Sequence, residues 1–271
     1  MLLEFDTTEV LCGRALQYFE GDGVTMDLTE GLRLFSLAAE RGNPHAQLFL
    51  GIMSEYGKGM VQDFCQAARW YRMAAEQGDE FAQYSLGLLY SNGTGVERNE
   101  GEAAHWFRLS ALQGYADAQC NLGGMYKNGR GVEKNEAEAV KWYRLAAEQN
   151  NAVAQRFLGL AYRIGKSVAT DAAEAVKWFR LAAGQGDAYA QYFLGLMYEE
   201  GDSVRQDRSM AAHWYQLAAD QGNSYAQYSL GLLYKNGTGV EEDEAEAVKY
   251  FWLSADQGNE GAQYLLDSME I

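Results

Sequence analysis

Apolar and polar residues follow a pattern along the chain that repeats every 36 residues. Three residues after the Gln of a recurring Ala-Gln pair comes Leu-Gly, and a Tyr usually follows three residues later, as at Leu86-Gly87 and Tyr90. Ala, Leu and Tyr at this spacing share one face of a helix, and the Gly lets a second helix approach closely. Each repeat is therefore predicted to contain a helix, named helix A, with its apolar face turned inward. The pairs are Ala46-Gln47, Ala82-Gln83, Ala118-Gln119, Ala154-Gln155, Ala190-Gln191, Ala226-Gln227 and Ala262-Gln263.

A Gly-x-Gly turn follows helix A, as at Gly93 and Gly95, and is weakened to Gly-x-Ser in two repeats. Four residues beyond the turn comes an Asp or an Asn. These side chains favour the first position of a helix, because their oxygen accepts a hydrogen bond from a free backbone N–H of the first turn. A second helix, helix B, is predicted to begin at Asp27, Asp63, Asn99, Asn135, Asp171, Asp207 and Asp243.

Helix B carries a small residue and, three positions later, a large aromatic residue. We expect the aromatic ring to be buried, so that replacing Trp142 by Ala costs about 3–5 kcal/mol. Gly ends most helices B, and an Asn or Asp such as Asp79 then caps the next helix A. The aromatic positions are Trp70, Trp106, Trp142, Trp178, Trp214 and Tyr250.

These motifs resemble one known family. A-Q-x-x-L-G-x-x-Y-x-x-G-x-G-V stands at 82–96 and again at 226–240, and A-x-x-W-[YF]-x-x-[AS]-A-x-Q-G stands at 67–78 and 103–114. The pattern is similar to the Sel1-like repeat family of bacteria, whose members are relatives of the tetratricopeptide repeats. The resemblance implies an all-α fold, a right-handed α/α superhelical solenoid of 36-residue helix-turn-helix repeats. It implies an adaptor function in general terms only, because a fold does not specify a function.

The register of the motifs predicts one solenoid domain over 1–271. The first repeat is degenerate, with Val10-Leu11 in place of Ala-Gln, as expected at the end of a solenoid where one face meets water. The predicted repeats are 7–42, 43–78, 79–114, 115–150, 151–186, 187–222 and 223–258, followed by a capping helix at 259–271. Leu265, Leu266, Met269 and Ile271 form an apolar tail that we expect to meet a partner or a continuation of the array.

The composition changes the expected partner rather than the fold. The formal net charge of -16 and the pI near 4.6 disfavour nucleic acid and anionic membranes, and favour a basic protein partner. No stretch has the length of a transmembrane helix, and the first residues lack the features of a signal peptide. As written the chain is predicted to be cytoplasmic; it would be periplasmic or secreted if a signal peptide has been removed. We expect a monomer, with a dimer through the terminal helix as the alternative.

Catalytic and ligand-binding motifs are not apparent, and we expect no enzyme activity, cofactor or metal. His105 and His213 occupy a helix B position where other repeats have Lys, which indicates a solvated face. Cys12, Cys65 and Cys120 are odd in number and widely spaced, so they are predicted to be buried or half-buried thiols rather than disulfides. The Gly-x-Gly turns follow helices, not strands, and none continues into a phosphate-binding motif.

Binding residues are expected at positions of helix A that vary between repeats. The resemblance to tetratricopeptide repeats places the ligand-facing positions, on a concave surface, one before the Ala and two, six, nine and ten after it; we call these positions the helix A row. An aromatic stripe in this row would supply contact area to a partner, or its rings would pack against the next helix A instead. The stripe consists of Phe81, Tyr84, Tyr189, Tyr192, Tyr225, Tyr228 and Tyr264.

A basic cluster lies in the same row, formed by Lys127, Arg156 and Arg163 together with Asn128. Arg can bind a carboxylate through two hydrogen bonds, so the cluster is a candidate site for a peptide carboxylate. A salt-bridged surface patch is the alternative. The sequence thus predicts a non-enzymatic scaffold that binds a protein or peptide on helix A. The alternative is a toxin-immunity or host-contact protein that uses the same surface.

Overall fold

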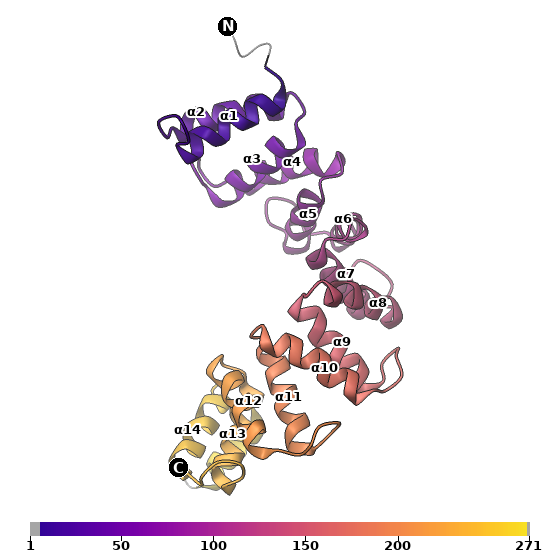
Figure 1. Ribbon diagram of the computed structural model, residues 1–271, viewed down its shortest axis with the longest axis vertical. Helices are drawn as coiled ribbons and strands as arrows, with labels where there is room; N and C mark the ends of the chain where they lie inside the picture. The colour runs from indigo at the N-terminus through magenta and orange to yellow at the C-terminus, as the bar shows by residue number, and fades with distance from the viewer. Residues whose placement is uncertain (1–5, 270–271) are drawn as a thin grey trace. The chain divides into compact units, whose positions relative to one another are not determined.

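The computed structural model describes residues 6–269, and within them the chain forms fifteen helices and no strand (Figure 1). This confirms the predicted all-α helical-repeat solenoid. Odd-numbered helices up to α13 are helices A, even-numbered helices are helices B, and α15 is the terminal helix A. The helices are α1 (Thr8–Glu20), α2 (Leu28–Glu40), α3 (Pro44–Tyr56), α4 (Phe64–Glu76), α5 (Glu80–Asn92), α6 (Glu100–Leu112), α7 (Ala116–Asn128), α8 (Glu136–Glu148), α9 (Ala152–Ile164), α10 (Ala172–Gly184), α11 (Ala188–Glu200), α12 (Arg208–Asp220), α13 (Ser224–Asn236), α14 (Glu244–Ala255) and α15 (Glu260–Ser268).

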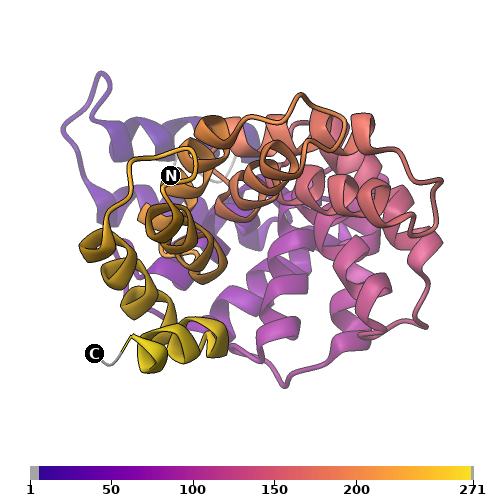
Figure 2. The same ribbon diagram turned by 90° about the horizontal axis from the view of Figure 1, so that it is seen from below.

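The backbone divides into two compact units, unit 1 (Met1–Ala139) and unit 2 (Val140–Ile271), with the division inside α8. Within each unit a helix packs on the helices before and after it, α1 through α7 in unit 1 and α9 through α15 in unit 2 (Figures 1 and 2). Each repeat thus covers its apolar faces with its neighbours. The single domain over 1–271 stays a prediction.

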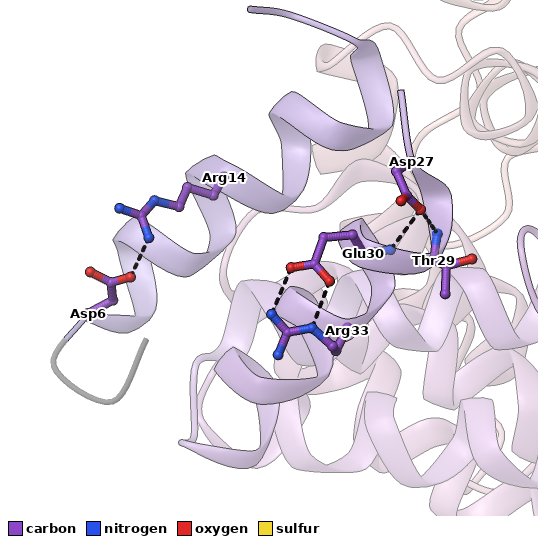
Figure 3. Close-up of polar contacts among 6 residues, drawn as sticks. All are labelled: Asp6, Arg14, Asp27, Thr29, Glu30 and Arg33. Atoms are coloured by element: carbon purple, nitrogen blue, oxygen red, sulfur yellow. Dashed lines mark hydrogen bonds and ion pairs between the residues drawn. The ribbon is translucent and has the colours of Figure 1, made fainter. Parts of the chain in front are cut away.

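The predicted caps form at the helix ends. Asp27 Oδ1 accepts hydrogen bonds from the backbone nitrogens of Thr29 and Glu30, both at 3.0 Å, at the start of α2 (Figure 3). One turn later an Arg33–Glu30 ion pair at 2.7 Å covers the same helix end. Helix A is capped in the same way, as where Asp79 Oδ1 accepts from the Ala82 nitrogen at 2.8 Å. Tyr115 stands at the start of α7 and provides no side-chain cap.

Unit 1 carries one further ion pair at its first helix. Arg14 of α1 donates to Asp6 Oδ2 at 2.6 Å (Figure 3).

At the other end of the chain, the apolar tail packs on its own unit. Leu266 is buried, and Leu265 and Met269 pack against the core around Phe251. Ile271 lies outside the described residues.

The ring of helix B that is buried in every repeat is not the Trp but the aromatic residue that follows it. The Trp position itself is buried at Trp106, Trp178 and Tyr250, and only half-buried at Trp70, Trp142 and Trp214. Trp142 is only half-buried, so the prediction of a buried Trp142 was wrong. Apolar periodicity gives the inward face of a helix, but two adjacent aromatic residues both lie near that face, and the second points more directly at helix A. The residues after the Trp or Tyr that are buried in this way are Tyr71, Phe107, Tyr143, Phe179, Tyr215 and Phe251.

This buried ring rests on the Gly of the Leu-Gly pair. A Cβ atom added to Gly87 would lie 2.7 Å from Cδ1 of Phe107, and one added to Gly195 would lie 2.6 Å from Cδ1 of Tyr215. Real Cβ atoms do not approach other atoms so closely, so only Gly leaves room for the ring. The glycine therefore sets how closely helices A and B of one repeat approach.

The Gln of the Ala-Gln pair has a specific structural task. Gln83 is buried, and its Nε2 donates to the Ala75 carbonyl of the preceding helix B at 3.1 Å. Its Oε1 accepts a hydrogen bond from Nε2 of Gln113, at the end of helix B of its own repeat, at 2.9 Å. Gln191 makes the corresponding contacts with Ala183 and Gln221 in unit 2. A buried amide thus links consecutive helices B, which explains why the Gln recurs.

Replacing Gly87 by Ala should lower the free energy of unfolding by about 1–3 kcal/mol, because the new methyl group would overpack Phe107. Gly13 in α1 is the matched control, since a Cβ there meets nothing within 4 Å. Gly13→Ala should raise stability by about 0.5–1 kcal/mol through its higher helix propensity. Urea unfolding followed by circular dichroism measures both, and equal effects of the two variants would contradict the packing assigned to Gly87.

Candidate functional site

A groove of about 380 Å³ lies on the helix A row of unit 1, between α3 and α5. Most of its lining residues occupy row positions, and the rest are Tyr71 of α4, Ser85 of α5 and Tyr115 before α7. Of the described residues that line it, Glu55 alone carries a charge. The lining residues are Leu48, Ile52, Glu55, Tyr56, Tyr71, Phe81, Tyr84, Ser85, Leu88 and Tyr115.

Two rings of the predicted stripe lie in this groove. Phe81 is 48% exposed, whereas Tyr84 is half-buried and packs 5.8 Å from the Phe107 ring between centroids. Tyr115 joins both, at 5.1 Å from Phe81 and 4.9 Å from Tyr84. Burial, and next the Asp117 carboxylate, raise the pKa of Tyr84 to about 12. Phe81 therefore offers its surface to solvent, while Tyr84 contributes to both the core and the groove.

The Glu55 carboxylate is held in place by neighbouring helices. Tyr71 of α4 donates its hydroxyl proton to Glu55 Oε2 at 2.5 Å, and the Ser85 side chain of α5 hydrogen-bonds the Tyr71 hydroxyl. Burial and the Glu55 carboxylate raise the pKa of Tyr71 well above its ordinary value. Since a charged acceptor makes a hydrogen bond stronger, this arrangement fixes the Glu55 side chain at the groove.

Sequence reasoning missed this Glu–Tyr–Ser arrangement, although a signal for it exists. Four repeats later the same residue types recur, and Tyr215 donates to Glu199 at 2.6 Å with Ser229 beside it. Four repeats have Phe in place of this Tyr, at 35, 107, 179 and 251, and there the row position holds Phe19, Ser91, Arg163 or Lys235 instead of Glu. The repeat with Tyr143 is the exception, since its row position holds Lys127.

The aromatic stripe of unit 2 divides into two kinds of ring. Tyr189 and Tyr225, directly before the Ala of their repeats, are exposed. Tyr192 and Tyr228 are half-buried, with ring centroids 5.8 Å from Tyr215 and 6.1 Å from Phe251. Tyr264 of α15 is exposed. Rings at the position directly before the Ala are thus exposed to solvent. Rings at the second position after the Ala pack against the buried aromatic residue of helix B.

Two of the basic residues, Arg156 and Arg163, are engaged in ion pairs. Arg156 Nε lies 3.0 Å from Asp187 Oδ2, with the two side chains only 17% and 10% exposed, and its guanidinium is 5.1 Å from the Tyr189 ring centroid. Arg163 pairs with Glu200 at 3.2 Å. In unit 1, Asn128 donates to the Gly124 carbonyl at 2.9 Å. Lys127 also lies in unit 1, whereas Arg156 and Arg163 lie in unit 2, and the basic cluster as a joint site stays a prediction.

The remaining chemistry-bearing residues lie apart from the groove. His45, His105 and His213 are exposed, which confirms the solvated face predicted for the latter two. Cys12 is half-buried and Cys120 buried, but Cys65 is exposed because it lies on the outer face of α4, so the predicted burial was wrong for Cys65. Among residues 6–269, no helix combines the length and apolar character that a membrane span requires.

A model of the Sel1 repeat matches seven segments that together cover most of the chain: 11–43, 44–79, 81–115, 116–151, 152–187, 188–223 and 224–259. The chain belongs to the Sel1 repeat family. The match extends to the first repeat, in which other residues stand at the Ala-Gln and Leu-Gly positions. Sel1 repeat proteins are in general scaffolds for protein interaction.

Two solved structures are similar over nearly the whole chain. One is a protective antigen present in uropathogenic Escherichia coli strains that displays an SLR fold; it is 36% identical, with a TM-score of 0.85 over 97% of this chain. The match spans 56% of that protein's chain. The other is a Sel1 repeat protein from Oxalobacter formigenes, 35% identical, with a TM-score of 0.75, covering 97% of this chain and 76% of the other. No curated protein matches the chain.

Replacing Arg156 by Gln should lower the free energy of unfolding by about 1–2 kcal/mol, because it leaves the largely buried Asp187 carboxylate without its cation. Arg163→Gln is the control: its partner Glu200 is 51% exposed, so the loss should stay within about 0.5 kcal/mol. Thermal and urea unfolding measure both. A ligand-binding role for Arg156 without a structural one would leave its variant as stable as the parent.

Stability should fall as the pH rises from 10 toward 12. The pKa of Tyr84 is raised in the folded state, from an ordinary value of 10.0 to about 12, so folding opposes loss of its proton. Its contribution is full below pH 10 and is lost as the pH passes through the folded pKa. Tyr84→Phe should make this fall shallower, and Tyr225→Phe, at an exposed ring, should not. Urea unfolding midpoints at pH 9 and pH 11 test the difference.

Proposed function

We propose that the chain is a non-enzymatic scaffold that binds a protein or peptide along the helix A row. The observation that carries this proposal is the groove between α3 and α5, together with the exposed rings at the position before the Ala. That position holds Phe81, Tyr189 and Tyr225, but also His45 and Asp117, so packing does not require an aromatic residue there. Exposed rings that the core does not need are typical of protein-binding surfaces.

The groove favours binding over catalysis. Catalysis of proton transfer needs a group whose pKa lies near the working pH. Burial raises the pKa of Tyr71, which therefore keeps its proton and serves to hold Glu55. The groove walls stand on helices that are fixed by the ring–glycine contact, so the surface is rigid, and a rigid surface loses little entropy when a partner binds.

The net charge of -16 supports a basic partner, because the mean field attracts cationic surfaces and speeds their encounter. We propose that the chain acts as a monomer. We propose the cytoplasm as its compartment, with the periplasm or the outside of the cell as the alternative.

A second candidate function is contact with a host, favoured by one observation. The similar Escherichia coli protein is described as a protective antigen of uropathogenic strains, although this chain corresponds to only 56% of it. Neutralisation of a cationic toxin would use the same surface and is favoured by the net charge of -16. Both variants of the proposal place the partner on the helix A row.

The test is capture of partners by the immobilised full chain from extracts of the source organism, quantified by mass spectrometry. Phe81→Ser and Tyr225→Ser remove exposed rings from the row and should change stability by no more than about 0.5 kcal/mol. Leu112→Ser is the control, because Leu112 is 68% exposed at the end of helix B in α6. We expect at least one protein of the extract to be captured by the parent chain and by Leu112→Ser. The two row variants, Phe81→Ser and Tyr225→Ser, should fail to capture it. Equal retention by all four proteins would contradict the proposal.

A further inference from the structure

The Glu55 carboxylate is a negative charge held in a fixed position in an otherwise apolar and aromatic groove. One of its oxygens, Oε2, accepts the hydroxyl proton of Tyr71, which α4 holds in the core. Its other oxygen, Oε1, accepts no hydrogen bond from the described residues and remains available. The side chain cannot easily turn away, because the short bond to Tyr71 holds it. A cation entering the groove would therefore meet a fixed charge with one free acceptor.

The apolar and aromatic walls suit a long cationic side chain. Tyr56 and Phe81 are exposed, and aromatic faces attract cations. Lys58 Nζ already lies 5.9 Å from the Tyr56 ring centroid, so this rim accepts a positive charge. Ile52 and Leu88 line the groove and can cover the methylene stem of a basic residue, as apolar surfaces do elsewhere.

Unit 2 has an arginine near the corresponding carboxylate, paired with the glutamate next to it in the chain. There Glu199 accepts the hydroxyl proton of Tyr215 at 2.6 Å, as Glu55 does from Tyr71. Arg163 pairs with the adjacent Glu200 at 3.2 Å and lies 5.8 Å from the Phe193 ring centroid, and its charge acts on Tyr192 together with those of Glu199 and Glu200. The guanidinium of Arg163 thus lies on the row and has Glu200, the neighbour of Glu199, as its counter-ion.

Unit 1 has the carboxylate without that guanidinium. The position of unit 1 that is equivalent to Arg163, four repeats earlier, holds Phe19. The position equivalent to Glu200 holds Tyr56. The corresponding groove is therefore lined by rings and by Glu55, and no arginine of the described residues lines it. The two units carry the same Glu–Tyr–Ser arrangement, but only unit 2 supplies its own arginine beside it.

We propose that the groove of unit 1 binds an arginine side chain of the partner, with Glu55 as its counter-ion. The guanidinium donates a hydrogen bond to Glu55 Oε1 and lies against the Tyr56 and Phe81 rings, and the stem runs along Ile52 and Leu88. Arginine fits better than lysine because its planar group can stack on a ring while it donates to a carboxylate. This inference rests on the proposed function, since it names the chemistry of the partner that the row would bind.

Methyl NMR of the full chain tests the inference directly. Isoleucine occurs only at Ile52, Ile164 and Ile271, so ¹³C-methyl labelling of isoleucine gives a reporter in the groove and one on α9 in unit 2. The probe is an acetylated and amidated Gly-Leu-Arg-Leu-Gly peptide. The control peptide replaces arginine by citrulline, which has nearly the same shape and no charge. We expect the arginine peptide to shift the Ile52 signal saturably and to leave Ile164 unchanged.

The affinity should fall about tenfold with the citrulline peptide, as expected for the loss of about 1.4 kcal/mol from one close charge pair. Glu55→Gln should cause a similar loss with the arginine peptide, while its amide oxygen still accepts from Tyr71. Glu199→Gln in unit 2 is the matched control and should leave the Ile52 titration unchanged. The citrulline comparison needs no variant and therefore does not depend on how Glu55→Gln folds.

Three results would overturn the inference: no shift at Ile52, citrulline binding as tight as arginine, or no effect of Glu55→Gln. If the citrulline peptide shifts Ile52 with equal affinity, the groove still binds peptides, and only the proposed preference for arginine is refuted. Failure of the proposed function shows elsewhere, in partner capture that is indifferent to Phe81 and Tyr225. The two failures are thus distinguishable.

Discussion

The contact on which the structure depends is that between a buried ring of helix B and the bare backbone of helix A. Phe107 on Gly87 and Tyr215 on Gly195 bring the two helices of a repeat as close as a ring allows. Burying such a ring contributes about 1.5–3 kcal/mol in each repeat. It also fixes the position of helix A, so that its outer side chains project from a rigid backbone. The helix A row is therefore placed by residues that do not belong to it.

A buried amide completes this framework. Gln83 bonds to a backbone carbonyl of the preceding repeat and to Gln113 of its own repeat, so consecutive helices B are joined through one side chain. A buried polar group that lost either partner would be costly, whereas an apolar residue would tolerate several alignments. We interpret the Gln as the residue that fixes the register between repeats. Ring, glycine and Gln together account for the strict period of 36 residues.

Much of this framework could be predicted from the sequence, because helix caps and apolar faces are local. Asp27 and Asp79 cap the helices that their positions predict. Non-local features could not be predicted in the same way. Trp142 and Tyr143 are adjacent in a helix, and only packing shows which of them is fully buried. The sequence makes Arg156 a candidate ligand-binding cation, because its partner, Asp187, is 31 residues away and its position in the repeat indicates only a helix cap. The seven rings of the aromatic stripe shared a sequence pattern but differ in burial.

The central claim is that the partner lies on the helix A row and not on helix B. Site-specific incorporation of the photo-crosslinking residue p-benzoylphenylalanine tests it most directly, at Phe81 on the row and at Leu112 on helix B, both exposed. Irradiation in the source organism should give a discrete adduct to one partner from position 81 and none from position 112. An adduct from position 112 alone would contradict the account.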